Sequence, residues 1–173
     1  MNHRMLKLAS SLVVMVFFFT FSPTSTAVAS ATFMPKGGTF TFSVGTGPDG
    51  IAIGGSGNVW VTNFGSSSVT KLSSSGATLG TFSVGSDPWG IAIDGSGNVW
   101  VTNFGSSSVT KLSSSGATLG TFSVGSHPEG IAIDGSGNVW VVNSGSSSVN
   151  MLTGEASPPQ FFPYVGPQWP WVI

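Results

Sequence analysis

The chain of 173 residues contains no cysteine and few charges, since Asp, Glu, Lys and Arg together make up 6% of it. The absence of cysteine excludes disulfide bonds and thiolate metal sites, so folding must depend on apolar packing and strand pairing. Basic runs are also absent, and after residue 31 three lysines and six carboxylates give a net charge of −3 with His neutral. Because surfaces that bind nucleic acid are basic, we expect no nucleic acid as a partner.

Motifs that commonly carry catalysis are missing as well. The sequence has no Ser-His-Asp arrangement, no phosphate-binding glycine loop and no zinc-ligand spacing. His127 is the only histidine beyond the N-terminal segment. We therefore favour a protein that is not an enzyme, and any catalytic site would have to be of a lyase or hydrolase type with very few titratable groups.

The first 31 residues have the order of a secretory signal peptide. Arg4 and Lys7 precede Leu12–Phe21, a stretch of ten residues in which Thr20 is the only polar one, and small residues follow at 27–31. A membrane-spanning helix needs about 20 apolar residues, so an uncleaved anchor is the less favoured alternative. We expect residues 1–31 to be removed and the protein to be secreted, periplasmic or held at the cell surface.

The most prominent feature of the sequence is a unit that occurs three times. The pattern Gly-Ile-Ala-Ile-x-Gly-Ser-Gly-Asn-Val-Trp-Val occurs at residues 50–61, 90–101 and 130–141, a period of 40 residues. Two short apolar runs around a Gly/Ser/Asn turn are typical of a β-hairpin, and a hairpin repeated at this period is typical of a propeller. The tryptophan of each copy lies mid-strand between valines, so we expect it to pack in the core. These residues are Trp60, Trp100 and Trp140.

Alternation of polar and apolar residues predicts four strands in each unit. In the first unit they are Ile51–Ile53, Val59–Asn63, Val69–Ser73 and Thr78–Val84, and Thr39–Val44 repeats the last of them ahead of the unit. Four strands in one unit are the content of one propeller blade. The predicted fold class is therefore all-β, with propeller-type repeats in residues 39–152 that make about three four-stranded blades.

The third unit follows the pattern to Leu152 and lacks its fourth strand, whereas Thr39–Val44 is a spare strand of that type. In a closed ring such a strand completes the last blade and removes an exposed sheet edge. Propellers have about four to eight blades, so we expect an incomplete ring in one chain that a homodimer or higher homo-oligomer completes. The alternative is a truncated gene copy, without independent function, that never closes.

Residues 153–173 form a tail rich in proline and aromatic residues, with no strand or helix period. Proline at this density favours extended polyproline geometry. The sequence leaves three alternatives open: the tail packs across the open end of the repeats, it is disordered, or it is out-of-register sequence after a truncation.

The unit Pro-x-Gly-Ile-Ala-Ile-Asp-x-x-Gly-Asn-Val-Trp-Val-x-Asn resembles the NHL repeat, and especially the repeats of the streptogramin (virginiamycin B) lyase-like propellers. Its prolines are Pro48, Pro88 and Pro128, and its asparagines before Val-Trp-Val are Asn58, Asn98 and Asn138. The resemblance covers residues 39–152. It implies a propeller fold, but proteins with such repeats include lyases, gluconolactonase-like hydrolases and pure binding scaffolds, so it does not define the activity.

The copies disagree mainly in two loops. Residues 41–80 and 81–120 differ at four positions, of which 46, 47 and 49 precede the first strand of the unit, and Phe64 and Phe104 become Ser144 in the third copy. Both loops should emerge at one end of the blades, where propellers present their sites. We expect this binding rim to contact an unknown small molecule, glycan or protein. Its residues are Asp49, Phe64, Asp87, Trp89, Phe104, His127 and Glu129.

Two weaker chemical hypotheses remain. His127 could act as a general base, with Glu129 or a divalent cation such as Mg²⁺ or Ca²⁺ stabilising an enolate or oxyanion. The loops that begin at Asp94 and Asp134 superficially resemble calcium loops, but each supplies one carboxylate where calcium takes about six to eight oxygen ligands. Gly54 replaces the aspartate in the first copy while its neighbours are unchanged. We therefore favour hairpin turns in which the aspartate caps backbone N–H groups, and we assign no cofactor beyond the open alternative of Mg²⁺ or Ca²⁺.

The function we expect is that of a secreted propeller repeat protein that acts as a binding or cell-surface scaffold. The first alternative is a degenerate metal-dependent lyase or lactonase related to the streptogramin lyase-like proteins. The second is the truncated copy without independent function.

Overall fold

The structure is a computed structural model that describes residues 37–158. By its contacts the chain divides into residues 1–33 and 34–173, and all described residues lie in the second unit. The predicted signal peptide, residues 1–31, lies outside the described residues, as does the tail from residue 159 onward. In the described part, no helix is long and apolar enough to cross a membrane.

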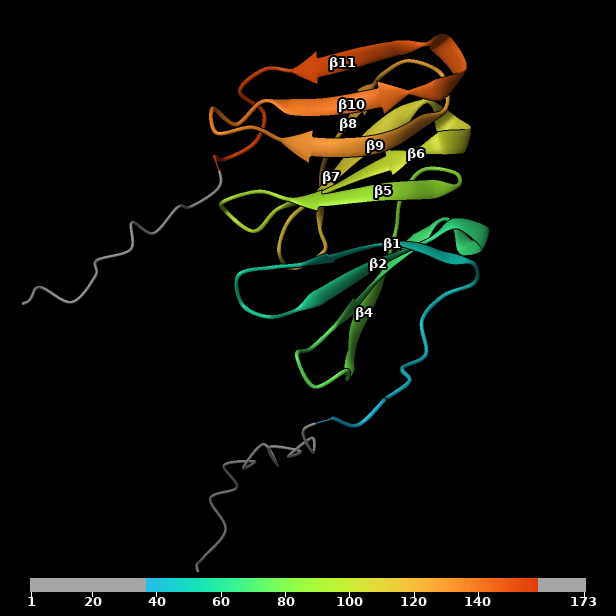
Figure 1. The fold of residues 1–173 in the computed structure, drawn as a ribbon, viewed down its shortest axis with the longest axis vertical. Coiled ribbons are helices and arrows are strands. Elements are labelled where there is room, and N and C mark those ends of the chain that lie inside the picture. Colours follow the sequence, from blue (N-terminus) through green and yellow to red (C-terminus); the bar gives the residue numbers. More distant parts are fainter. Residues whose placement is uncertain (1–36, 159–173) are drawn as a thin grey trace, which may run out of the picture. The chain divides into compact units, whose positions relative to one another are not determined.

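Residues 37–158 form three antiparallel sheets in chain order (Figure 1). The first sheet contains β1 (Pro48–Ile53), β2 (Val59–Asn63), β3 (Ser68–Leu72) and β4 (Thr78–Ser83). The second contains β5 (Pro88–Ile93), β6 (Val99–Asn103), β7 (Ser108–Leu112) and β8 (Thr118–Ser123). The third contains β9 (Pro128–Ile133), β10 (Val139–Asn143) and β11 (Ser148–Leu152). Short 3-10 helices follow the second strand of each sheet at Phe64–Ser66, Phe104–Ser106 and Ser144–Ser146.

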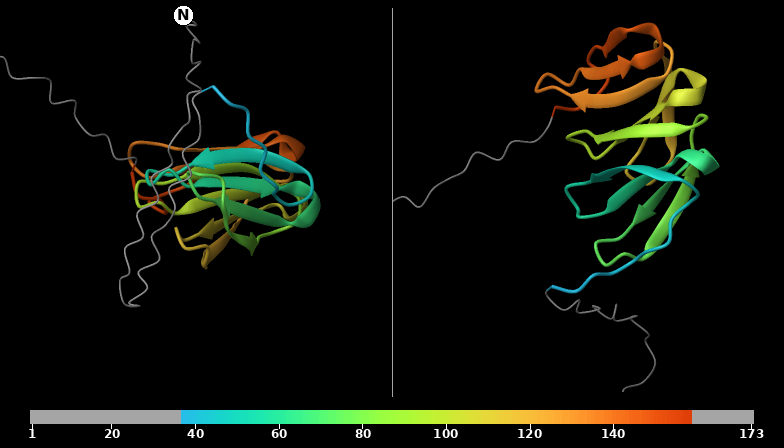
Figure 2. Two further views of the ribbon diagram at one scale, coloured as in Figure 1. Left: turned by 90° about the horizontal axis from the view of Figure 1, so that it is seen from below. Right: turned by 45° about the vertical axis from the view of Figure 1, so that its right-hand side comes forward.

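This arrangement confirms the all-β class and the blade-like repeat. The sheets follow one another without closing a ring in the described residues (Figure 2). Strand β5 contacts β1 and β2, and β9 contacts β5 and β6, so each sheet packs on the one before it.

One predicted strand is wrong. Residues 38–44, which include Thr39–Val44, form no strand, so the described chain has eleven strands rather than twelve. A strand requires a neighbour with which to exchange backbone hydrogen bonds. The sheet that lacks a fourth strand is the third one, where β11 forms the edge, and that edge belongs to the opposite end of the repeat.

The core consists of two apolar layers between successive sheets. In the layer between the first and second sheets, Ile91 and Ile93 of β5 pack against a cluster that includes Trp60 and Val69. The layer between the second and third sheets repeats this contact with Ile131 and Ile133. The buried side chains of both layers are those of Trp60, Val69, Val99, Val101 and Leu112, and of Trp100, Val109, Val139, Val141 and Ala156.

The prediction that all three tryptophans are buried is confirmed for Trp60 and Trp100 and is wrong for Trp140. Trp60 and Trp100 are 2% and 0% exposed, whereas Trp140 is 41% exposed. The difference arises because no sheet follows the third one in the described residues, so the face that carries Trp140 has nothing to cover it.

Polar contacts also join successive sheets. The Thr62 hydroxyl donates to the backbone oxygen of Trp89 at 2.8 Å and accepts from the N–H of Gly50 at 2.7 Å. Thr102 makes the same contacts with Glu129 and Gly90 at 2.9 and 2.7 Å. Each threonine therefore ties its own sheet to the next one.

The glycines in these links are required by the close approach of two sheets. A Cβ at Gly50 would collide with the backbone oxygen of Trp89, and one at Gly90 with that of Glu129. A side chain at either position would therefore separate the sheets and break the threonine link.

We predict that Trp100→Ala lowers the free energy of unfolding of a chain that begins at residue 32 by about 3–5 kcal/mol, because it empties a fully buried site. Trp140→Ala is the matched control, since it removes the same side chain from the same position of the exposed third sheet, and its cost should be clearly smaller. Urea unfolding followed by circular dichroism measures both. Equal costs would contradict the burial that distinguishes the two positions.

Candidate functional site

The two variable loops of each copy lie side by side at one end of the strands. Backbone hydrogen bonds join them: Phe64 N–H donates to Gly47 O at 2.8 Å, and Phe104 N–H donates to Asp87 O at 2.9 Å. The third copy repeats this bond between Ser144 and His127 at 3.0 Å. The loop backbones are thus held in the same conformation while their side chains differ.

The aromatic residues of the rim form one continuous row across the three sheets. The ring of Trp89 lies 5.7 Å from that of Phe64 and 5.2 Å from that of Phe104, between ring centroids. The His127 imidazole stacks on Phe104 at 4.4 Å with an interplanar angle of 10°. Trp89 is 37% exposed, whereas Phe64 and Phe104 are half-buried. We call these four rings, Phe64, Trp89, Phe104 and His127, the aromatic row.

A backbone constraint explains one of the variable positions. Gly47, Asp87 and His127 have φ angles of 61°, 53° and 52°, in the left-handed region. Among residues other than glycine, Asn, Asp and His are enriched in this region, although three serines also adopt it here. The variation Gly–Asp–His therefore stays within the residues that the turn tolerates, and His127 has a conformational reason to be there besides any chemical one.

The rim carboxylates lie next to the aromatic row but do not form a cluster. The Glu129 carboxylate accepts a hydrogen bond from the Ser144 hydroxyl at 2.7 Å. The Asp87 carboxylate lies against Gly105, where a Cβ would collide with it. Asp49 is exposed, and its carboxylate accepts no hydrogen bond from the described residues. These groups are acceptors at the edge of an apolar surface rather than members of one charged site.

The donor set does not match the chemistry proposed for a metal-assisted enzyme. Among residues 37–158, no three side chains of His, Cys, Asp or Glu lie close enough together to hold a metal ion. No hydrogen bond joins His127 to Glu129 in this part of the chain, since Glu129 pairs with Ser144 and the His127 ring packs on Phe104. Neither Mg²⁺ nor Ca²⁺ fits these residues, and no catalytic step is derived through either ion.

Asp94 and Asp134 act as hairpin caps. One oxygen of Asp94 accepts the N–H groups of Ser96 and Asn98, each at 2.9 Å, and the other accepts Asn98 Nδ2 at 3.0 Å and the indole Nε1 of Trp100 at 3.2 Å. Asp134 repeats these four contacts at 2.8–2.9 Å. The turn of the first copy keeps its backbone hydrogen bonds around Gly54, as the capping interpretation predicts.

These contacts lower the pKa values of both carboxyl groups. Burial by itself would raise the pKa of Asp94, but the hydrogen bonds from the side chains of Asn98 and Trp100 and from backbone N–H groups outweigh burial and hold that pKa below its ordinary value. The indole of Trp140 and then the side chain of Asn138 hold the pKa of Asp134 well below its ordinary range.

Sequence reasoning missed a second feature, a pocket of 630 Å³ between the first and second sheets at the other end of the strands. The pocket lies at Gly54, the position that an aspartate occupies in the second and third copies. The replacement of aspartate by Gly54 is one of the four differences between the first two copies, but the sequence did not show that the residues around Gly54 line a partly open pocket.

Three twisted antiparallel sheets stacked face to face, with variable loops at one end, define a run of β-propeller blades. Residues 86–112 match the family model of the NHL repeat, which confirms the predicted repeat type for that segment. The chain has no significant sequence match among curated proteins.

Solved structures of propeller enzymes share this fold. A catalytically inactive virginiamycin B lyase from Staphylococcus aureus with quinupristin has a TM-score of 0.58 at 19% identity, over 65% of this chain and 40% of that one. A gluconolactonase from Xanthomonas campestris has a TM-score of 0.54 at 20% identity, over 65% and 39%. Identities this low show the fold alone, and the chain spans about two fifths of the length of these proteins.

We predict that Asp94→Asn weakens the pH dependence of stability. Folding lowers the pKa of Asp94, so its ionised form stabilises the folded state above the unfolded-state pKa of about 4, and this contribution is lost as pH falls through the lower folded-state pKa. The variant should unfold more easily than the wild type at neutral pH and should lose less stability on acidification. Urea unfolding at a series of pH values measures the difference.

The matched control is Asp49→Asn, which removes an exposed carboxylate that no described residue contacts by hydrogen bond. If this control and Asp94→Asn changed the pH dependence equally, the capping contacts would not be its source.

Proposed function

We propose that this protein is a non-enzymatic binding module whose ligand lies along the aromatic row. The observation that carries the proposal is the continuous contact of four rings from three different sheets, with Trp89 37% exposed at its middle. Rings at this position contribute little to the two apolar layers between the sheets, which have their own side chains. An apolar surface held on rigid sheets and bordered by a few polar groups has the composition of a ligand site.

Charge and hydrogen-bonding capacity narrow the ligand class. The seven rim residues include three carboxylates and no lysine or arginine. Such a surface disfavours anions and accepts hydrogen bonds from hydroxyl, amide or ammonium groups. We therefore propose a neutral or cationic ligand that presents an apolar ring to Trp89 and donors to the neighbouring carboxylates; an oligosaccharide meets both requirements.

We predict that Trp89→Ala weakens ligand binding by about tenfold, the equivalent of ~1.4 kcal/mol, because it removes the most exposed ring of the row. The probes are neutral oligosaccharides such as cellohexaose and chitohexaose, together with quinupristin, the ligand named with the S. aureus lyase. Titration calorimetry measures the affinity, and mass spectrometry of each probe after incubation measures turnover.

Leu119→Ala is the control, since Leu119 is exposed on β8 and lies outside the rim. Absence of binding by the wild type, or equal binding by the Trp89→Ala variant, would reject the aromatic row as the site. Conversion of a probe would instead support the alternative of a lyase or lactonase.

We further propose that a second copy of this chain covers the outer faces of the end sheets. On the first sheet Ile51 and Ile53 are 66% and 68% exposed. Their equivalents, Ile91 and Ile93, pack on the Trp60 face of the preceding sheet. The exposed face of the third sheet offers the equivalent surface, so the Ile51–Ile53 face of another copy would continue the internal interface in a head-to-tail contact. That face carries Trp140, Val142, Val149 and Met151.

This contact also accounts for the spare segment at residues 39–44. In a two-copy ring the segment of one copy could pair with the edge strand β11 of the other and supply its missing fourth strand. Two chains of three sheets give six blades, within the usual range of about four to eight.

We predict that the chain without its signal peptide forms a stable oligomer and that Ile51→Glu dissociates it, because the substitution places a charge in an apolar contact. Light scattering coupled to size-exclusion chromatography measures the mass. Leu119→Glu is the control, since it adds the same charge to an exposed leucine of the internal second sheet. A stable, folded wild-type monomer would reject the assembly.

A further inference from the structure

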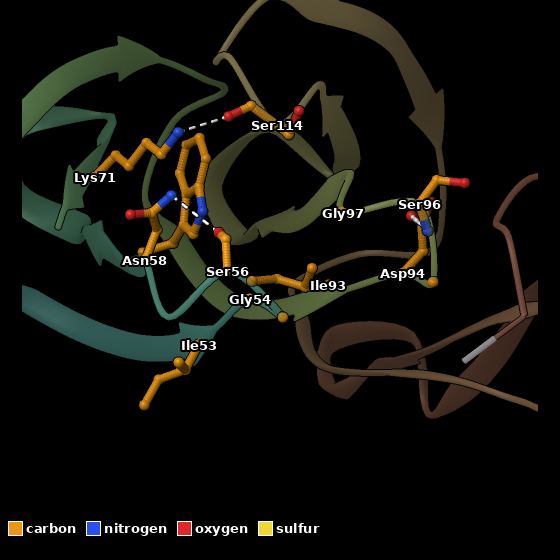
Figure 3. Close-up of a pocket in the computed structure, with 13 residues that line it drawn as sticks. Ile53, Gly54, Ser56, Asn58, Lys71, Ile93, Asp94, Ser96, Gly97 and Ser114 are labelled. Atoms are coloured by element: carbon orange, nitrogen blue, oxygen red, sulfur yellow. Dashed lines mark hydrogen bonds between the residues drawn. The ribbon is translucent and has the colours of Figure 1, made fainter. Parts of the chain in front are cut away.

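A pocket of 630 Å³ lies between the first and second sheets, at the hairpin that joins β1 to β2. This hairpin closes the end of the strands opposite the rim, because β1 begins at the rim with Pro48 and ends at Ile53. Figure 3 shows Ser56, Asn58 and Lys71 on one side of the pocket and Asp94 and Ser96 on the other. The pocket is therefore separate from the aromatic row.

The pocket corresponds to a position that a carboxylate fills in the other copies. In the second hairpin the carboxylate of Asp94 receives the N–H groups of Ser96 and Asn98, the Asn98 side-chain amide and the Trp100 indole. Asp134 receives the same four donors in the third hairpin. Four donors that converge on two oxygens form a carboxylate-binding arrangement.

The first hairpin keeps these donors but has glycine in place of the aspartate. Its backbone is the same, with Gly54 N–H bonded to Asn58 O at 2.9 Å. Within residues 37–158, the N–H groups of Ser56 and Asn58 and the indole N–H of Trp60 have no acceptor, and Asn58 Nδ2 turns to the Ser56 hydroxyl at 3.0 Å. The donors that hold a carboxylate in the other two hairpins therefore belong to residues that line the pocket, and no side-chain carboxylate of the first hairpin occupies them.

We propose that this pocket binds a small organic carboxylate, whose oxygens take the place at Gly54 that the Asp94 carboxylate takes at the second hairpin. Space permits it, because even a Cβ at Gly54 would meet no described atom closer than 3.7 Å, the Cδ1 of Ile93. The Lys71 ammonium lines the same pocket and supplies a positive charge. Asp94 also lines it, but both its oxygens accept hydrogen bonds from its own hairpin.

The ligand also has an apolar part. Ile93 forms an apolar wall of the pocket, and the Trp60 indole lines it. The corresponding groove between the second and third sheets is filled by the chain itself: Ala156 packs with Trp100, and Ser157 exchanges hydrogen bonds with Gly95 and Asp94. A short aliphatic acid combines a carboxylate with the apolar group that these walls accept.

The test uses sodium formate, acetate and butyrate against sodium chloride at equal ionic strength and neutral pH. The chain without its signal peptide is followed by its thermal midpoint and by the indole N–H signals of its tryptophans in NMR. Carboxylates should raise the midpoint of the wild type in a saturable way and shift the Trp60 signal, because a ligand that binds the folded state stabilises it. Butyrate should act at lower concentration than formate.

Two substitutions of Gly54 provide the controls, and a third variant changes Trp60. Gly54→Asp should raise the midpoint without any added acid and abolish the carboxylate response, because its own side chain occupies the site. Gly54→Ala adds a Cβ but no oxygen, so it should keep the response. Trp60→Phe should weaken the response several-fold. A wild type that responds to carboxylates no more than to chloride, or a Gly54→Asp variant that responds like the wild type, would overturn the proposal.

Discussion

The packing of the second and third Ile-Ala-Ile strands, β5 and β9, on the Trp-Val face of the preceding sheet is the contact on which the rest of the structure depends. With few charges and no cysteine, the chain depends on strand pairing within each sheet and on burial of apolar surface between sheets. A single four-stranded sheet of this sequence would leave two apolar faces in water. In a stack of such sheets every internal apolar face is covered by a neighbouring sheet, and only the two end faces stay exposed to water.

The rigid packing of the sheets limits which residue types can occupy the positions of the rim. The threonine links and the loop-to-loop hydrogen bonds hold the backbone at positions 47, 87 and 127 in the left-handed region, which favours glycine and the enriched residues Asp and His there. The neighbouring positions 49, 89 and 129 have no such restriction and hold Asp, Trp and Glu. The chemical variety of the rim is therefore concentrated where the backbone tolerates it, and Trp89 is informative because no conformational demand selects it.

The strands and hairpin turns were predictable because they depend on residues close together in the sequence. Alternating apolar residues and Gly/Ser/Asn turns predicted the strand ends of the first unit within one residue, except that β1 begins three residues earlier than expected. The aspartate of the hairpin was identified as a cap. The wrong predictions concern residues whose structure depends on an adjacent strand or sheet that a single chain does not supply. Residues 39–44 have the pattern of a strand but no adjacent edge, and Trp140 has the pattern of a core residue but no covering sheet. The pocket at Gly54 was missed because a pocket between two sheets depends on how the sheets fit together.

The places where the third copy departs from the others bear on what covers its outer face. Val142 stands where Thr62 and Thr102 tie one sheet to the next, and Met151 stands where Lys71 and Lys111 lie over the indole rings. Both changes replace a polar group by an apolar one on a face that is exposed in a single chain. Such replacements raise the energetic cost of leaving the face in water and remove the hydrogen bond that an internal interface would make. An interface between copies built on this face would therefore depend on apolar burial alone, in contrast to the internal interfaces, which combine burial with a buried threonine link.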